Sequence, residues 1–282
     1  AVESSGYQPQ QDKYNGGTEG LLATIRNLKS TQALPIIASI NATSAGEWTD
    51  YAKSMEECGA DALELNWQPA IVDPDETSDQ IEQRLCDLVR QLCETVTIPV
   101  SVKLIQRFTN LASVSHKLHS AGAAGLVLFT HQPHWDVNID RMHWTIRWEL
   151  SPIDSLGANL EGIVRARTGQ QDLSIAASGG VRTAEDAIKA MIAGADVVMV
   201  TSEIYRDGPN AARKIVEGIH RYLDTSHFDS LAAFQEARPK VQLGPQRLMR
   251  LEYVEPMTRS EFYYDPTPVA SNDTCDSYGH QK

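Results

Sequence analysis

The sequence predicts an α/β barrel whose polar residues gather at one edge of a parallel sheet. Apolar strand-like runs alternate with helical segments, and the connections between them are a few residues long. A polar residue stands at or near the carboxyl end of nearly every run, the edge that carries the active site in such barrels. An open doubly wound sheet is the alternative fold. The nucleotide fingerprint that follows the first strand of those sheets is missing here, which favours the barrel.

Six segments have the composition of buried parallel strands. Each is a short run rich in aliphatic residues and bounded by Gly, Pro or polar residues. The runs lie near residues 36, 62, 99, 125, 174 and 197. The polar residues at or near their carboxyl ends are Asn41, Asn66, Lys103, Thr130, Ser178 and Thr201.

Helical segments are expected in most of the intervals. They cover Glu19–Lys29, Thr43 to Cys58, Ser78–Thr95, Asn110–Ala121, Ala184–Ala193, Pro209–Leu223 and Phe228–Ala237. Gly59, Gly122 and Gly194 follow three of these segments, and glycine is common just after the last turn of a helix. Thr183 stands three residues before Asp186, a spacing that predicts a capping box at the start of the helix between them.

A long insertion, Thr130 to Gly162, separates the fourth strand-like run from the fifth. Its alternating stretch Met142–Leu150 predicts a hairpin strand, and the insertion as a whole is expected to form a lid or wall over the pocket. His131 and His134 have the spacing of half a metal site. Nothing nearby in the sequence completes that site, so no metal is expected.

Composition and charge argue against several classes of partner. The net charge of −12 and the pI of 5.1 disfavour nucleic acid and anionic membrane surfaces. No apolar run approaches the length of about 18 residues that a membrane span needs. The four cysteines lack metal or disulfide spacing, and the N-terminus lacks the pattern of a signal peptide, so a cytoplasmic location is expected. The expected partners are a small-molecule substrate and, as one option, a second copy of the chain.

The stretch Ser174–Ser202 has the pattern of a phosphate seat. It reads as a strand, a Gly179-Gly180 turn, a helix and a second strand. Paired glycines let the backbone approach a ligand, and the helix that follows offers free N–H groups and a partial positive charge. The steric alternative is that the glycines only permit close packing. The stretch supplies the last two strands of the series, where barrels usually hold phosphate, and this favours the phosphate interpretation.

Taken in order, these segments resemble the FMN-dependent dihydroorotate dehydrogenase family, and most closely its bacterial dihydroorotate dehydrogenase-like branch. The resemblance covers roughly Leu34 to Met257. It is carried by PIIASIN, GADALELN, IPVSVKL, GAAGLVLF, ASGGVRTAEDAIKAMIAGADVVMVTS and FDSLAAFQEARP. The family fold is a TIM (β/α)₈ barrel that binds FMN at its carboxyl face, so the resemblance implies an incomplete barrel with six of the eight strands.

That resemblance also implies a domain organisation. The two opening strands of the family would precede residue 1, which implies a truncated N-terminus and exposed apolar strand edges and helix faces. Residues 1–19 are expected to form a flexible loop, residues 20–258 the FMN-binding barrel domain, and residues 259–282 a disordered tail.

The resemblance assigns cofactor-binding roles to residues at the strand ends. Those expected around the FMN phosphate are Ser178, Gly179, Gly180, Thr201 and Ser202. Those expected around the flavin ring or the adjacent substrate are Lys103, Asn66, Asn41 and Ser39. Beside the N1/O2 edge of the ring, a cation stabilises the negative charge of reduced flavin. The alternatives are a snorkelling or ion-paired lysine at Lys103 and turn-forming amides at Asn41 and Asn66.

The loop after Asn66 departs from the family pattern. The family places a Cys or Ser base in an Asn-x-Ser-Cys/Ser-Pro-Asn loop there, whereas Asn66–Ala70 reads NWQPA, without a thiol or hydroxyl. Thr130 stands in place of a further family asparagine. A missing base slows proton abstraction by about 10²–10⁴-fold. The catalytic residues are therefore unknown, and dihydroorotate, with its role in pyrimidine biosynthesis, is not expected as the natural substrate.

The sequence thus predicts an FMN-dependent oxidoreductase that transfers a hydride from a CH–CH group of a small molecule to flavin. Two alternatives stay open. One is a degenerate, non-catalytic barrel that binds a phosphorylated ligand or a partner protein. The other is a flavin-free barrel lyase or isomerase with a phosphate site, for which no catalytic Glu or Lys pair can be placed in the sequence.

Overall fold

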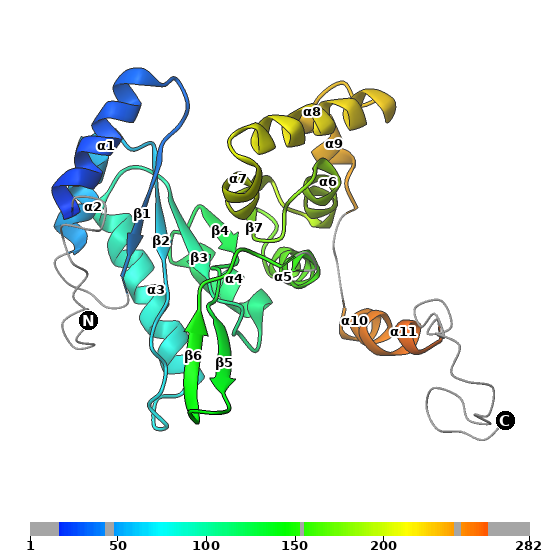
Figure 1. Ribbon diagram of the computed structural model, residues 1–282, viewed down its shortest axis with the longest axis horizontal. Helices are drawn as coiled ribbons and strands as arrows, with labels where there is room; N and C mark the ends of the chain where they lie inside the picture. Colours follow the sequence, from blue (N-terminus) through cyan, green and yellow to red (C-terminus); the bar gives the residue numbers. More distant parts are fainter. Residues whose placement is uncertain (1–16, 43–47, 153–154, 240–243, 259–282) are drawn as a thin grey trace. The chain divides into compact units, whose positions relative to one another are not determined.

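Six parallel strands form the central sheet of the fold (Figure 1). They are β1 (Ile37–Asn41), β2 (Ala62–Asn66), β3 (Val100–Leu104), β4 (Gly125–Leu128), β7 (Ser174–Ser178) and β8 (Val197–Met199). The spatial order β1-β2-β3-β4-β7-β8 follows the chain without a reversal. A doubly wound sheet reverses its strand order at a switch point, whereas a barrel does not. The sheet is therefore a curled half barrel, as the sequence predicts, and all six predicted strands are confirmed.

The computed structural model describes residues 17–42, 48–152, 155–239 and 244–258. The chain divides into two compact units, Ala1–Val241 and Gln242–Lys282, and the sheet belongs to the first. The described part of the second unit consists of α10 (Pro245–Met249), a π-helical segment (Arg250–Val254) and α11 (Glu255–Thr258). The domain limits expected at residues 19/20 and 258/259 stay predictions, and residues 1–16 and 259–282 lie outside the described ranges.

Nine helices of the first unit are described. They are α1 (Gly17–Thr31), α2 (Trp48–Glu57), α3 (Ser78–Thr95), α4 (Leu111–Ser120), α5 (Leu156–Gly169), α6 (Ala184–Ala193), α7 (Ser202–Asp207), α8 (Asn210–Thr225) and α9 (Leu231–Ala237). All but α5 and α7 were expected from the sequence. The capping box of α6 is confirmed, because Thr183 Oγ1 accepts from the N–H of Asp186 and the Asp186 carboxylate accepts from the N–H of Thr183. None of the described helices has the length and apolarity that crossing a bilayer requires.

Alternation along the strands separates the core from the functional face. Leu63, Leu65, Val102 and Leu104 are fully buried in the main hydrophobic cluster. Burying a leucine side chain stabilises the fold by about 1.5–3 kcal/mol. Their neighbours in sequence point to the opposite face of the sheet. That second face therefore receives the polar residues of the strands.

The two edge strands of the sheet carry exposed apolar side chains. Ile37 of β1 is 61% exposed and Val197 of β8 is 57% exposed. Among the described residues, no strand pairs with the outer edge of either strand. This agrees with the apolar strand edges expected of a half barrel.

The insertion after β4 contains a two-stranded antiparallel hairpin, β5 (His134–Asn138) and β6 (His143–Arg147), which confirms the expected hairpin strand. Cross-strand pairing places Trp135, Val137, Trp144 and Ile146 on one face. These four apolar side chains are 48–70% exposed. The hairpin projects from the carboxyl side of the sheet (Figure 1).

Candidate functional site

A cavity of about 480 Å³ opens at the carboxyl ends of β3, β4, β7 and β8. Small-molecule sites usually have volumes of about 300–1,000 Å³. Strands supply one part of the wall and the insertion after β4 supplies another. The lining residues are Lys103, Phe129, His131, Trp148, Glu149, Leu150, Ser151, Ser178, Gly179, Gly180, Val181, Arg182, Met199, Thr201, Ser202 and Tyr205.

Most of the residues proposed from the sequence line this cavity. Those that do are Lys103, Ser178, Gly179, Gly180, Thr201 and Ser202. Ser39, Asn41 and Asn66 are not part of its lining. Their cofactor-binding roles stay predictions. The insertion also contributes to the wall, as expected, through His131 and the segment from Trp148 to Ser151.

Lys103 is held by a buried carboxylate that the sequence analysis did not single out. Glu64 of β2 is only 6% exposed, and one of its carboxylate oxygens lies 3.5 Å from Lys103 Nζ. Ser39 Oγ donates to the same Glu64 oxygen at 3.0 Å. A buried carboxylate is costly unless it is paired and hydrogen-bonded, which explains both contacts. Lys103 is therefore ion-paired and also lines the cavity. The signal in the sequence was the single acidic residue inside the apolar run ALELN.

The two asparagines form a chain of amides beside the cavity. The parallel register places Asn41 of β1 opposite Asn66 of β2. Asn66 Nδ2 donates to Asn41 Oδ1 at 2.7 Å, and Thr130 Oγ1 donates to Asn66 Oδ1 at 2.9 Å. These bonds tie the ends of β1 and β2 to the segment after β4. Trp67, next in sequence, is fully buried and stacks on Phe108 with ring centroids 6.0 Å apart.

The Gly179-Gly180 turn has a steric reason for both glycines. Their φ angles are +95° and +75°, in the region that favours glycine. A Cβ on Gly180 would lie 2.6 Å from the backbone nitrogen of Leu156, at the start of α5. Asn159 of α5 is 3% exposed, and its Nδ2 donates to the carbonyls of Ser178 and Gly179 at 2.8 and 2.5 Å. Close packing and ligand approach are therefore compatible here.

The turn keeps free donors on its cavity side. No described residue accepts a hydrogen bond from the N–H of Gly179 or Gly180, and both residues line the cavity. Backbone N–H groups in such a turn form an anion-binding concavity. The hydroxyl of Ser202, by contrast, is already engaged. It accepts from the N–H of Ser151 at 3.0 Å and donates to Ser151 Oγ at 3.2 Å.

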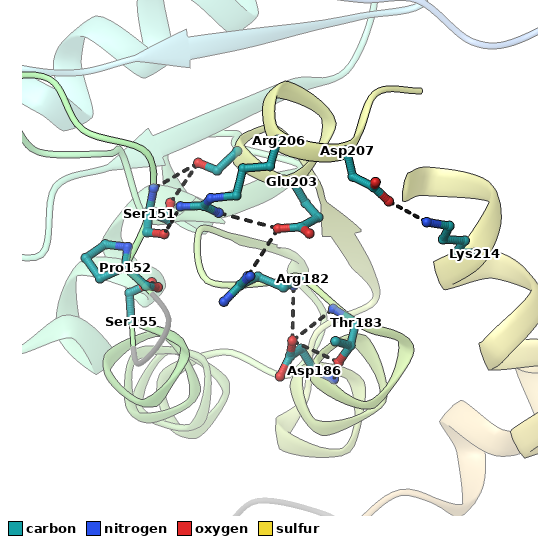
Figure 2. A network of polar contacts seen from close by, with 11 residues as sticks. Ser151, Pro152, Ser155, Arg182, Thr183, Asp186, Glu203, Arg206, Asp207 and Lys214 are labelled. Atoms are coloured by element: carbon teal, nitrogen blue, oxygen red, sulfur yellow. Dashed lines mark hydrogen bonds and ion pairs between the residues drawn. The ribbon is translucent and has the colours of Figure 1, made fainter. Parts of the chain in front are cut away.

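A charged cluster links Arg182, Glu203 and Arg206 to Ser151 of the insertion (Figure 2). Glu203 of α7 accepts from Arg182 Nε at 3.1 Å and from Arg206 Nη1 at 3.4 Å. Arg206 Nη2 donates to the carbonyl of Ser151 at 2.7 Å, which fastens α7 to the insertion. Two arginines share one carboxylate, so the cluster has a net positive charge. Nothing in the sequence brings Arg182 and Glu203 together, because they are 21 residues apart.

His131 is the imidazole in the cavity wall. Its Nε2 lies 2.6 Å from the carbonyl of Glu149, and its ring packs on Trp148 with centroids 5.6 Å apart. A carbonyl can only accept, so Nε2 carries a proton, and in the neutral imidazole Nδ1 then has the lone pair. Within the described ranges, no group of three or more His, Cys, Asp or Glu side chains is arranged to hold a metal ion.

A buried ionic network fixes β7 and β8 behind the turn. Arg167 of α5 is 4% exposed, donates to the carbonyls of Leu173 and Gly194, and pairs with Asp196. Burial lowers the pKa of Arg167. Burial alone would raise the pKa of Asp196, but hydrogen bonds from Ile175 N–H and Arg238, with the charge of Arg167, outweigh it and hold that pKa below its usual value.

Comparisons with known proteins agree with this architecture. The family model described as dihydroorotate dehydrogenase matches residues 155–223. A putative dihydroorotate dehydrogenase A (fumarate) of Aeropyrum pernix is 32% identical over 212 residues, which cover 71% of this chain and 66% of that protein. The catalytic subunit of dihydroorotate dehydrogenase B (NAD(+)) of Thermoplasma acidophilum is 25% identical over 225 residues, covering 77% and 72%.

A third relative is named as a subunit of a dihydropyrimidine dehydrogenase. The NAD-dependent dihydropyrimidine dehydrogenase subunit PreA of Escherichia coli K12 is 25% identical over 225 residues, covering 74% of this chain and 54% of that protein. The chain thus spans between about half and three quarters of the length of these relatives.

Proposed function

This chain belongs to the dihydroorotate dehydrogenase family, and on that basis we propose that it is an FMN-dependent oxidoreductase acting on a CH–CH group of a small molecule. One observation carries the proposal. A single cavity brings together Lys103 from β3, the Gly179-Gly180 turn after β7 and Thr201 after β8. These groups are a cation and an anion seat, the two features that a flavin phosphate ligand requires at its opposite ends.

The residues present fit FMN. The free N–H groups of Gly179 and Gly180, with Ser178, Thr201 and Ser202 around them, would hold the phosphate. Lys103 would lie by the flavin ring, with Asn66, Asn41 and Ser39 toward the ring or the substrate. When bound there, FMN supplies an acceptor for a hydride. Because the Glu64 carboxylate neutralises part of the charge of Lys103, the positive potential that the lysine would exert on the ring is weaker than that of an unpaired lysine.

Oxidation of a CH–CH group to C=C removes a hydride from one carbon and a proton from its neighbour. The usual thiol or hydroxyl is missing after Asn66, where the fully buried Trp67 stands instead. We propose that His131 accepts this proton, because it lines the cavity and in its neutral form has a lone pair on Nδ1. The Glu149 carbonyl fixes the tautomer and orients the ring. His131 follows β4, so in this proposal the base comes from the carboxyl end of β4 and not from the loop after β2, where the family places it.

Flavin binding is the primary test. The purified protein is titrated with FMN, and the change in flavin absorbance and fluorescence is followed. We expect saturable binding with one FMN per chain. Absence of any flavin signal, both in the protein as purified and after FMN addition, would refute the proposal.

A second test addresses the base. The flavin-loaded protein is mixed anaerobically with dihydropyrimidine-type and other CH–CH donors, and bleaching of the oxidised flavin is followed. His131→Asn should slow reduction by about 10²–10⁴-fold while FMN affinity is unchanged, since removing a general base costs that much. Equal reduction rates in both proteins would exclude His131 as the base.

The degenerate, non-catalytic barrel is the second candidate function. Its support is the loop after Asn66, which has no thiol or hydroxyl and directs its tryptophan into the core. The same titrations distinguish the two functions. Flavin that binds but is reduced by no donor tried would favour the degenerate barrel, and reduction by any donor would exclude it.

We propose further that the chain pairs with a second copy through the hairpin. The apolar face formed by Trp135, Val137, Trp144 and Ile146 is exposed, and an isolated two-stranded hairpin is marginal in water. Stable interfaces bury about 800 Å² per partner with aromatic residues at their centre. Sedimentation of the protein and of the Trp135→Ser/Trp144→Ser variant tests this, and equal masses for the two would refute it.

A cytoplasmic location is also proposed. Cys58, Cys86 and Cys93 are free thiols, as expected where disulfides are reduced. Burial raises the pKa of Cys86 and Cys93, so these thiols serve packing rather than nucleophilic chemistry. Localisation of the tagged protein in cell fractions would check the proposal.

A further inference from the structure

The arginine cluster consists of Arg182, Glu203 and Arg206 (Figure 2), and Arg182 lines the cavity beside the Gly179-Gly180 turn. Arg182 follows the Gly179-Gly180 turn by two residues, and Glu203 follows Ser202. The cluster therefore joins the two chain segments that form the anion seat. The side chains of the three residues are 28%, 17% and 29% exposed, so water does not fully screen their charges.

The two arginines use their donors differently. Arg206 commits Nη1 to Glu203 and Nη2 to the carbonyl of Ser151. Arg182 commits only Nε to Glu203, and its two terminal nitrogens have no acceptor among the described residues. A guanidinium group held at Nε keeps a planar fork of N–H donors that matches the spacing of phosphate oxygens. Arg206 is thus a structural tie, whereas Arg182 is a donor without an acceptor in the wall of a cavity.

The charge of the site points the same way. Glu64 offsets the charge of Lys103, and the hydroxyl proton of Ser202 goes to Ser151. A phosphate carrying nearly two negative charges at neutral pH then meets neutral N–H donors at the turn. The cluster holds two positive charges against one negative, and it supplies the missing cation.

We propose that Arg182 binds the phosphate of the cofactor, that Glu203 positions it through Nε, and that this contact makes the site select phosphorylated over unphosphorylated flavin. The inference rests on the proposed function, because it takes FMN as the ligand. It adds a side-chain cation to an anion seat otherwise formed by backbone and hydroxyl groups.

FMN and riboflavin are the probes, because they differ only in the phosphate. Affinities of both for the wild type and for Arg182→Gln are measured by fluorescence titration. We expect the variant to lose about 10- to 100-fold in FMN affinity, since losing a hydrogen bond to a charged group weakens binding by about one to two factors of ten. Riboflavin affinity should stay unchanged, which also shows that the variant folds. Arg213→Gln is the matched control, because Arg213 is exposed on α8, lies outside the cavity lining and donates its side-chain hydrogen bond to Asn210.

The outcomes separate the inference from the proposed function. A wild type that binds neither flavin refutes the proposed function, and this inference falls with it. A wild type that binds FMN, with an Arg182→Gln variant of equal FMN affinity, overturns the inference alone. Equal losses of FMN and riboflavin affinity would also overturn it, because the residue would then act on the fold or the ring and not on the phosphate.

Discussion

Gly180 gives the sharpest test of how the turn and helix α5 support each other. In Gly180→Ala the new Cβ would lie 2.6 Å from the backbone nitrogen and 2.8 Å from the Cα of Leu156, and neither atom can rotate away. The φ of +75° adds a backbone penalty of about 1–2 kcal/mol for a residue with a Cβ. Overpacking against fixed atoms costs about 1–3 kcal/mol. We therefore expect the free energy of unfolding to fall by about 2–5 kcal/mol.

The same substitution should also weaken FMN binding. Relief of the clash moves either the turn or α5, and Asn159 of α5 holds the carbonyls of Ser178 and Gly179. Both free N–H groups of the seat then lose their alignment.

Denaturant unfolding, followed by circular dichroism and by tryptophan fluorescence, measures the change in the free energy of unfolding. Gly157→Ala is the matched control, because it makes the same Gly-to-Ala change in α5, the helix that Gly180 packs against, at a position with no atom within 4 Å of the added Cβ. The control should be neutral or stabilising by up to about 1 kcal/mol, since alanine favours a helix over glycine. The reasoning is refuted if the two variants have the same stability.

Three other predictions concern charges. Arg167→Ala should lower the free energy of unfolding by about 1–3 kcal/mol, because it leaves the buried carbonyls of Leu173 and Gly194 without their donor and removes one of the two arginines paired with Asp196, whereas the exposed control Lys189→Ala should have little effect in the same denaturation assay. The native pKa of Asp196 is depressed, so its stabilising contribution is complete above the ordinary aspartate pKa of about 3.9 and is lost as pH falls through the native pKa. Asp196→Asn should therefore make the free energy of unfolding fall less steeply as the pH is lowered from neutral to acidic values. Lys103→Met should lower the reduction potential of bound flavin and Glu64→Gln should raise it, each by on the order of 30 mV in a dye-equilibration titration. Shifts of the same sign in both variants would contradict the pairing.

The strands were predictable because parallel strands are buried on the helix-facing side and have short aliphatic runs between breakers. Leu63 and Leu65 illustrate this, with Gly59 before the run and Asn66 at its end. Helix α5 was not predicted. Its buried face includes Asn159, Gly162 and Arg167, so the apolar period that signals a helix is interrupted by residues kept for specific contacts.

The site was predictable in part, for a related reason. Residues at strand ends converge in any parallel barrel, so Lys103, Gly179 and Thr201 could be grouped from their positions alone. Glu64 could not be paired with Lys103 in advance, because strand register and side-chain direction decide that contact. Arg182 and Glu203 meet only because the turn after β7 and the start of α7 adjoin in the fold.

The Gly179-Gly180 turn depends partly on local sequence and partly on tertiary structure. Local sequence determined the turn, the capping box of α6 and the strand on each side, because φ preference, capping and aliphatic runs act over a few residues. Only the tertiary structure decided that α5 packs against Gly180, that Asn159 braces its carbonyls and that Arg182 keeps free donors at the cavity. Those contacts join residues about 20 apart or more in the chain, and their energies exist only after the intervening elements have folded.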